Sequence, residues 1–150
     1  MALRWLFAAL HLLALGIGLG AVWTRSRALR QTLDASGLER VFAADSWWAL
    51  AAALWLSTGL VRLFSSLDKG TEYYLNNRFF LLKMVLFVTV VLLEIAPMRA
   101  LIRWRGVTRR GEMPDTTRAA AFARTSLVQA VLVVAMVFAA TAIARGFGMF

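Results

Sequence analysis

Four stretches of this chain are long and apolar enough to cross a lipid bilayer. They lie at about residues 5–23, 45–64, 78–97 and 121–144, and a helix needs roughly 20 mostly apolar residues to cross a hydrocarbon core about 30 Å thick. Lipid offers no partner for backbone N–H and C=O groups, and four segments cannot close a barrel, so all four must be helices. We therefore predict an all-α fold, a polytopic membrane four-helix bundle that forms one domain over residues 1–150.

The first apolar run also has features of a cleavable signal peptide. Arg4 precedes the apolar core, and the small residues Gly18 and Gly20 lie near its end. We favour a retained span, because His11 interrupts the run and because the arginines that follow it resist export: Arg25, Arg27 and Arg30.

The composition excludes several kinds of site. The chain has no cysteine, which excludes disulfides, thiolate metal sites and iron–sulfur clusters with cysteine ligands. Its single histidine makes a zinc site unexpected. The glycine-rich stretch at residues 16–20 lies inside a span and follows no strand, so it is not a nucleotide-binding fingerprint. We find no serine–histidine–aspartate triad and no phosphate-binding loop.

The basic residues are distributed unevenly along the chain. Of the 17 lysines and arginines, most lie in or beside the loops at residues 24–44 and 98–120. Basic residues in short loops stay cytoplasmic, so we predict that these loops are cytoplasmic and that both termini lie outside. The net charge of +9 then reflects this orientation and anionic lipid headgroups, and no nucleic acid is expected as a partner.

Two expectations concern the membrane surfaces. The segment at residues 24–45 is expected to lie along the inner surface, with Leu29, Leu33, Val41 and Phe42 facing lipid. Aromatic residues near the span ends are interpreted as interfacial anchors and not as parts of a binding site; they are Trp5, Trp23, Trp47, Trp48, Trp104, Tyr73 and Tyr74.

Four polar residues fall at one depth of the predicted bundle. With the termini outside, His11 and Lys83 lie in the outer third of the inward-running first and third spans, and Ser57 and Thr58 reach the same level on the second. A charged side chain within the bilayer costs about 2.5–3.5 kcal/mol on insertion scales, and such groups usually face the bundle interior and mark function. We predict that these side chains share an inward-facing pocket in the outer half of the bundle.

Simpler explanations exist for both ionisable residues. Lys83 lies roughly 7–8 Å below Arg78 by the helical rise, close enough for its ammonium to snorkel to the headgroups. The equivalent explanation for His11 is a neutral imidazole that forms a hydrogen bond with a neighbouring helix. The small residue Gly18 on the His11 face leaves room either for a flat cofactor or for a packed helix.

Small residues also suggest self-association. Gly16 and Gly20 form a GxxxG pair, and Ala14 and Gly18 form a second small-residue pair. Such pairs let transmembrane helices approach closely. We therefore expect a homodimer as one arrangement of the protein.

Polar residues at the cytoplasmic ends of the spans are expected to hold the bundle together. Glu94 and Asp45 lie at this level, where ion pairs with arginines would fix the inner end. Gln129 is expected to form an interhelical hydrogen bond. The candidate arginines for the ion pairs are Arg25, Arg99 and Arg124.

Long segments of the chain resemble a known family. The stretches "FAALHLLALGIGLGAVW", "AADSWWALAAALWLSTGLVRLF" and "DKGTEYYLNNRFFLLKMVLFVTVVLLEIAPMRALIRW" are similar to an uncharacterised family of bacterial four-span inner-membrane proteins, a domain of unknown function. The resemblance covers nearly the whole chain. It implies the fold and a bacterial inner (plasma) membrane, and it brings no activity with it.

A more distant resemblance implies a cofactor. A histidine early in the first span and a lysine early in the third, within "FFLLKMVLF", are similar to the HemJ family of protoporphyrinogen oxidases and, more loosely, to CopD-type membrane domains. The resemblance implies haem b, with His11 as the metal ligand and Lys83 as a catalytic residue that contacts haem or substrate. Gly18, Ser57 and Thr58 would then lie beside the cofactor. With one histidine per chain, the iron would have an open site, a His/Lys pair or ligands from two subunits.

These observations lead to one expected function and two alternatives. We expect an integral inner-membrane protein that binds haem or acts in a haem pathway, and hence an oxidoreductase, with His11 and Lys83 facing a shared pocket. One alternative is a transport or channel component in which Lys83 binds an anion or a proton. The other is a structural membrane protein. The substrate and the electron partner stay open.

Overall fold

The computed structural model describes residues 2–64 and 71–148, and most of this part is helical. The helices are α1 (Ala2–Ala28), α2 (Ala35–Phe64), the short α3 (Thr71–Leu75), α4 (Arg78–Arg109) and α5 (Ala119–Ala144). Four of them, α1, α2, α4 and α5, are long and apolar enough to span a membrane, and each contains one of the predicted spans. No described residue lies in a β-strand. The predicted all-α polytopic bundle is therefore confirmed.

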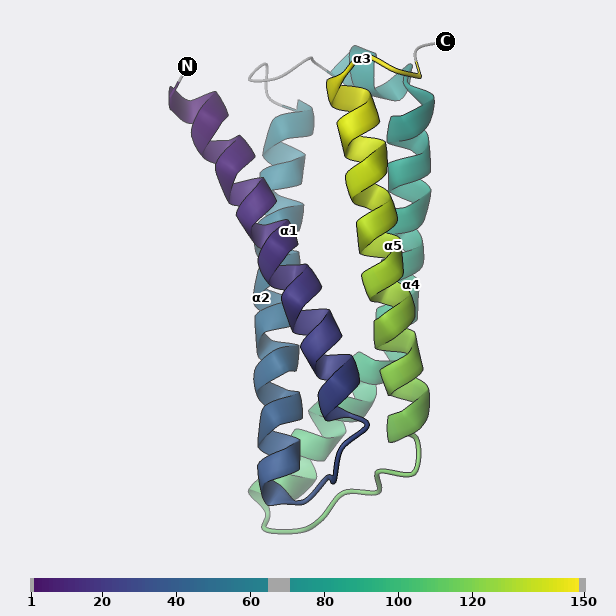
Figure 1. Ribbon diagram of the computed structural model, residues 1–150. Coiled ribbons are helices and arrows are strands. Elements are labelled where there is room, and N and C mark those ends of the chain that lie inside the picture. The colour runs from purple at the N-terminus through teal and green to yellow at the C-terminus, as the bar shows by residue number, and fades with distance from the viewer. Residues whose placement is uncertain (1, 65–70, 149–150) are drawn as a thin grey trace.

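The four long helices form two antiparallel pairs (Figure 1). Helix α1 packs on α2 and α4 packs on α5, and α1 also packs on α5 to join the pairs. Both chain termini lie at one end of the bundle, here called the terminal end. The α1–α2 and α4–α5 connections lie at the other, here called the loop end. At the terminal end α1 leans away from α5, so the two pairs separate there (Figure 1).

Helix α4 bends and passes beneath α1 toward α2 at the loop end (Figure 1). Pro97 lies inside this helix, where proline removes a backbone hydrogen bond and its ring crowds the preceding turn. The bend brings Leu101 and Trp104 into a core with Leu38 of α2 and Phe122 of α5. This core closes the loop end of the bundle.

The segment at residues 24–45 was predicted to lie along the membrane surface, and it does not. Its first residues continue α1 to Ala28, and its last ones form the start of α2 from Ala35. Leu29 and Val41 are 2% and 0% exposed, and Leu33 and Phe42 pack against the same core. The prediction was wrong because the bent end of α4 supplies an apolar surface that the local sequence does not reveal.

Asp34 caps the first turn of α2. Its Oδ1 accepts hydrogen bonds from the backbone N–H of Gly37 at 2.8 Å and from the Ser36 hydroxyl at 2.9 Å, as an N-cap residue does. These two bonds, the first above all, lower the pKa of the Asp34 carboxyl below its ordinary value of 3.8. The ionised cap thus stabilises the fold above that value, and the contribution is lost as the pH falls through the lowered pKa.

At the centre of the bundle, Arg25 of α1 is 0% exposed and binds side chains from the other three long helices. Its Nε donates to Ser126 at 3.1 Å, and its Nη1 donates to Asp45 at 2.9 Å and to Glu94 at 2.7 Å. Its Nη2 donates to the second Glu94 oxygen at 2.7 Å and to Gln129 at 3.0 Å. A guanidinium has five N–H donors, so every donor of Arg25 is used.

Two further side chains extend this group, here called the Arg25 network (Arg25, Asp45, Glu94, Arg105, Ser126 and Gln129). Gln129 donates to Glu94 at 2.8 Å, and Arg105 donates to the second oxygen of Asp45 at 2.9 Å. Two arginines thus face two carboxylates, and the network carries no net charge. The predicted pairing of Glu94 and Asp45 with an arginine is confirmed, and of the three candidates the shared partner is Arg25. The interhelical role of Gln129 is also confirmed.

The first prediction concerns the tight start of α2. A Cβ at Gly37 would overlap the backbone carbonyl oxygen of Thr32, which cannot move without the turn before α2. We expect Gly37→Ala to lower the free energy of unfolding by about 1–3 kcal/mol, the usual cost of overpacking. Gly106→Ala is the matched control, because a Cβ there meets nothing within 4 Å. If the two variants unfold at the same temperature in detergent, this account is contradicted.

The second prediction concerns the Arg25 network. Arg25→Met leaves two partly buried carboxylates without their shared cation, and removing one partner of a buried ion pair costs about 3–5 kcal/mol. We expect a loss of this order in detergent unfolding, and partial recovery when Glu94→Gln is added. Arg27→Met on the exposed side of α1 is the control and should change little. A similar effect of Arg25→Met and Arg27→Met would show that the network does not hold the bundle together.

Candidate functional site: an aromatic-lined cavity between the helices

A cavity of about 200 Å³ lies between α2 and α4, next to the Arg25 network. All four long helices contribute to its lining, which is mainly aliphatic and aromatic. Within the described part of the chain, Glu94 is the one charged residue among the lining residues. Side chains that represent the four helices are Leu15, Trp48, Trp55, Phe87, Glu94 and Met136.

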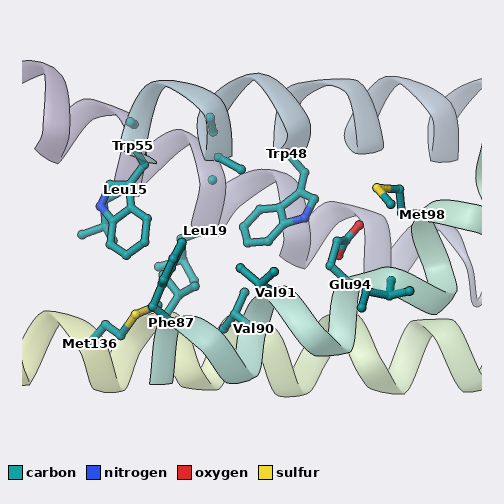
Figure 2. Close-up of a pocket in the computed structure, with 16 residues that line it drawn as sticks. Leu15, Leu19, Trp48, Trp55, Phe87, Val90, Val91, Glu94, Met98 and Met136 are labelled. Carbon is teal, nitrogen blue, oxygen red and sulfur yellow. The ribbon is translucent and has the colours of Figure 1, made fainter. Parts of the chain in front are cut away.

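The two tryptophans of the cavity extend from α2 toward α4 (Figure 2). Trp48 and Trp55 are seven residues apart, two helical turns, and so lie on one face of α2. Trp55 meets Phe87 of α4 with ring centroids 5.3 Å apart. At the opposite end of the cavity the Glu94 carboxylate lies beside Trp48 (Figure 2). The cavity therefore runs from an aromatic cluster to the edge of the Arg25 network.

Gly18 of α1 makes room for one of these aromatic rings. A Cβ at this position would lie 3.4 Å from Ala51 Cβ and 3.5 Å from the Trp48 ring. The absence of a side chain thus lets α1 lie directly on α2 at this level. Gly18 belongs to the cavity wall.

His11 is fixed by contacts with α2. It is 8% exposed, and its Nδ1 lies 2.9 Å from the Thr58 hydroxyl oxygen. That hydroxyl donates its hydrogen to the backbone carbonyl oxygen of Leu54 at 2.7 Å, so His11 Nδ1–H donates to Thr58 and the lone pair lies on Nε2. The imidazole stacks on Trp55 with ring centroids 5.2 Å apart and planes 19° apart. Gly59 gives it space, because a Cβ there would lie 3.3 Å from His11 Cε1.

Lys83 of α4 contacts the same tryptophan. Its Nζ lies 5.4 Å from the centre of the Trp55 ring, within the range of a cation–π interaction. The side chain therefore reaches across to α2, which is not the orientation expected of a lysine that snorkels along its own helix. Across residues 2–64 and 71–148, no carboxylate lies within 4.0 Å of this ammonium.

The structure brings some of the predicted site residues together and separates others. His11, Thr58 and Lys83 gather around Trp55. Ser57 is exposed and donates to the carbonyl oxygen of Ala53 on its own helix at 2.9 Å. Gly18 lies two turns farther toward the loop end, against Trp48. Within the described ranges, no group of three or more histidine, aspartate or glutamate side chains is arranged to hold a metal ion.

Two tryptophans that matter for this site were missed or misassigned from the sequence. Trp55 was not singled out, although it contacts both His11 and Lys83. Trp48 was predicted to be an interfacial anchor with Trp104, but these two are 8% and 6% exposed and belong to the interior. Trp48 and Trp55 share one face of α2, and this shared face is the sequence signal that could have identified them. Three of the predicted anchors are exposed: Trp5, Trp23 and Trp47.

The chain was also compared with known proteins. No curated protein matches it, and no solved structure does. A family model described as a predicted membrane protein, DUF2214, matches residues 3–148, and the four apolar helices agree with that description. The chain is therefore an integral membrane protein that belongs to the DUF2214 family.

Proposed function

We propose that this membrane protein binds a lipophilic molecule in the cavity between α2 and α4. The observation that supports the proposal is the lining itself, which joins aliphatic and aromatic side chains from all four long helices. Sites for small molecules are typically concave and mainly apolar, with a few polar groups at defined positions. Trp48, Trp55 and Phe87 supply flat apolar surfaces that favour such a ligand.

The rim of the cavity reaches the lipid-facing surface of the bundle. Val91, Ile95 and Met98 of α4 line the cavity and are 47%, 37% and 45% exposed. Ala52 of α2 lines the opposite side and is also exposed. A ligand dissolved in the bilayer can thus reach the cavity sideways, between α2 and α4, without crossing an aqueous phase.

The charged residue in the lining does not oppose an apolar ligand. Both Glu94 oxygens accept hydrogen bonds from Arg25, and Gln129 also donates to one of them. The carboxylate is therefore compensated within the Arg25 network. The exposed edge of the network forms a rigid inner wall beside the ligand.

A bulky side chain at the rim should block binding. Ala52→Phe places a ring at the cavity edge. Ala53 is also exposed but does not line the cavity, so Ala53→Phe places the same ring elsewhere on α2. We expect a brominated alkane in lipid nanodiscs to quench tryptophan fluorescence saturably, because bromine quenches indoles that it contacts. Ala52→Phe should weaken this quenching several-fold and Ala53→Phe should not. Equal titrations for the two variants would contradict the proposal.

Haem b is the second candidate occupant, and with it an oxidoreductase role. It derives from the resemblance to the HemJ family, and one observation favours it. The Thr58 hydroxyl accepts from His11 Nδ1–H, and a hydrogen bond of this kind orients metal-ligating histidines and leaves Nε2 for the metal. Lys83 at the same tryptophan would supply a cation beside a ring or its propionates.

The available space does not fit a porphyrin. The cavity does not include His11 in its lining, and its volume of about 200 Å³ is below the range of about 300–1,000 Å³ that is usual for pockets that hold small molecules or cofactors. Haem would require α1 and α2 to separate from α4 near Trp55. We therefore derive no chemical step from haem, and a ligand narrower than a porphyrin is the better fit.

The visible absorption spectrum decides between the two candidates. If haem is bound, protein purified after haem-replete expression shows a Soret band that His11→Ala removes. We expect a colourless preparation, because the cavity is too small. A Soret band that survives His11→Ala would exclude His11 as the ligand but not haem itself.

We also propose an orientation and an assembly. The Arg-rich segments at residues 24–44 and 98–120, which comprise the two connections and the adjoining helix ends, lie together at the loop end. This supports a cytoplasmic loop end with both termini outside, in a bacterial inner membrane. Single cysteines introduced into these loops of a cysteine-free chain report the side by reagent accessibility. Gly16 and Gly20 are exposed on α1, which supports a homodimer that cross-linking in membranes would detect.

A further inference from the structure

The face of α4 that lines the cavity also carries Lys83, one helical turn beyond the end of the cavity. Lys83, Phe87, Val91 and Glu94 are spaced at i, i+4, i+8 and i+11, so they follow one face of the helix. The last three line the cavity, and Lys83 lies at their terminal-end side. By the helical rise, Lys83 and Glu94 are separated by about 16 Å along the axis. The cavity therefore has a lysine near one end and a carboxylate at the other.

The two charges differ in how they are compensated. Glu94 is held by Arg25 at 2.7 Å through both oxygens. Within the described part of the chain, the Lys83 ammonium contacts the Trp55 ring and has no carboxylate within 4.0 Å. A partly buried cation in a membrane span normally pairs with an anion. Among the described residues, the Lys83 charge therefore has no anionic partner, whereas the Glu94 charge is compensated.

We propose that the ligand of the cavity is a single-chain anionic amphiphile, a fatty-acid-like carboxylate whose head group pairs with Lys83 while its chain lies along Phe87 and Val91 toward Trp48. This inference rests on the proposed function. A cavity of about 200 Å³ suits one slender chain better than the two chains of a phospholipid. A carboxylate provides an acceptor for the Lys83 ammonium, which has no carboxylate partner among the described residues, and hydrogen bonds between charged partners are the strong ones.

The depth of Lys83 agrees with such a ligand. Helix α4 begins at Arg78, so Lys83 lies roughly 7–8 Å inside the end of the helix. An amphiphile that moves sideways out of the adjoining leaflet keeps its head group near this depth while its chain enters between α2 and α4. Trp55, which lies beneath the ammonium and lines the cavity, connects the two parts of the site.

The test compares a brominated fatty acid with its methyl ester in nanodiscs at neutral pH. The two share one chain and differ in the charge of the head group. We expect half-maximal quenching of wild-type tryptophan fluorescence at a concentration of acid about tenfold lower than that of ester, because only the acid offers a charged acceptor to the Lys83 ammonium. Lys83→Met should bring the acid to the level of the ester. Lys83→Arg should keep the preference for the acid.

The possible outcomes separate this inference from the proposed function. If acid and ester quench wild-type protein equally, and Ala52→Phe weakens both, the cavity binds apolar chains without regard to charge and Lys83 is not a head-group site. If neither ligand is affected by Ala52→Phe, the proposed function itself fails. The comparison of acid and ester on wild-type protein needs no variant, so misfolding of Lys83→Met, visible by circular dichroism, does not prevent a decision.

Discussion

The fully bonded guanidinium of Arg25 is the interaction on which the rest of this structure depends. It donates to Asp45 of α2, to Glu94 of α4 and to Ser126 and Gln129 of α5, so one side chain of α1 joins all four long helices. A buried cation is tolerated in a membrane only when its charge and its donors are both satisfied. Because these partners come from the three other long helices, only the assembled bundle satisfies them.

The position of this network explains the shape of the cavity. The helices are held together near the loop end, while α1 leans away from α5 toward the terminal end (Figure 1). Between these two levels α2 and α4 face each other across large aromatic side chains, with Trp55 close to Phe87. The cavity thus has a closed, charge-balanced inner wall and a lipid-facing side, which is the geometry that we propose for ligand binding.

The polar contacts were easier to predict than the apolar ones. Charged groups inside a span must find partners, so the pairing of Glu94 and Asp45 with an arginine followed from their depth, although the sequence left three arginines open. The exposure of Trp48, Leu29 and Val41 was predicted wrongly. Core and lipid-facing positions are both apolar in a membrane protein, and hydropathy alone does not distinguish them. The aromatic cluster around Trp55 was missed for the same reason.

By itself, the sequence determined four spanning helices, because a bilayer leaves an apolar segment of that length no other structure. It also placed His11, Thr58 and Lys83 at one depth, because depth follows from the helical rise. Only the tertiary structure decided which faces of the helices meet: the bend of α4 at Pro97, the choice of Arg25 as the central cation, and the gathering of His11 and Lys83 at Trp55. These features depend on the rotation and tilt of each helix, which are set by packing between side chains from distant parts of the chain.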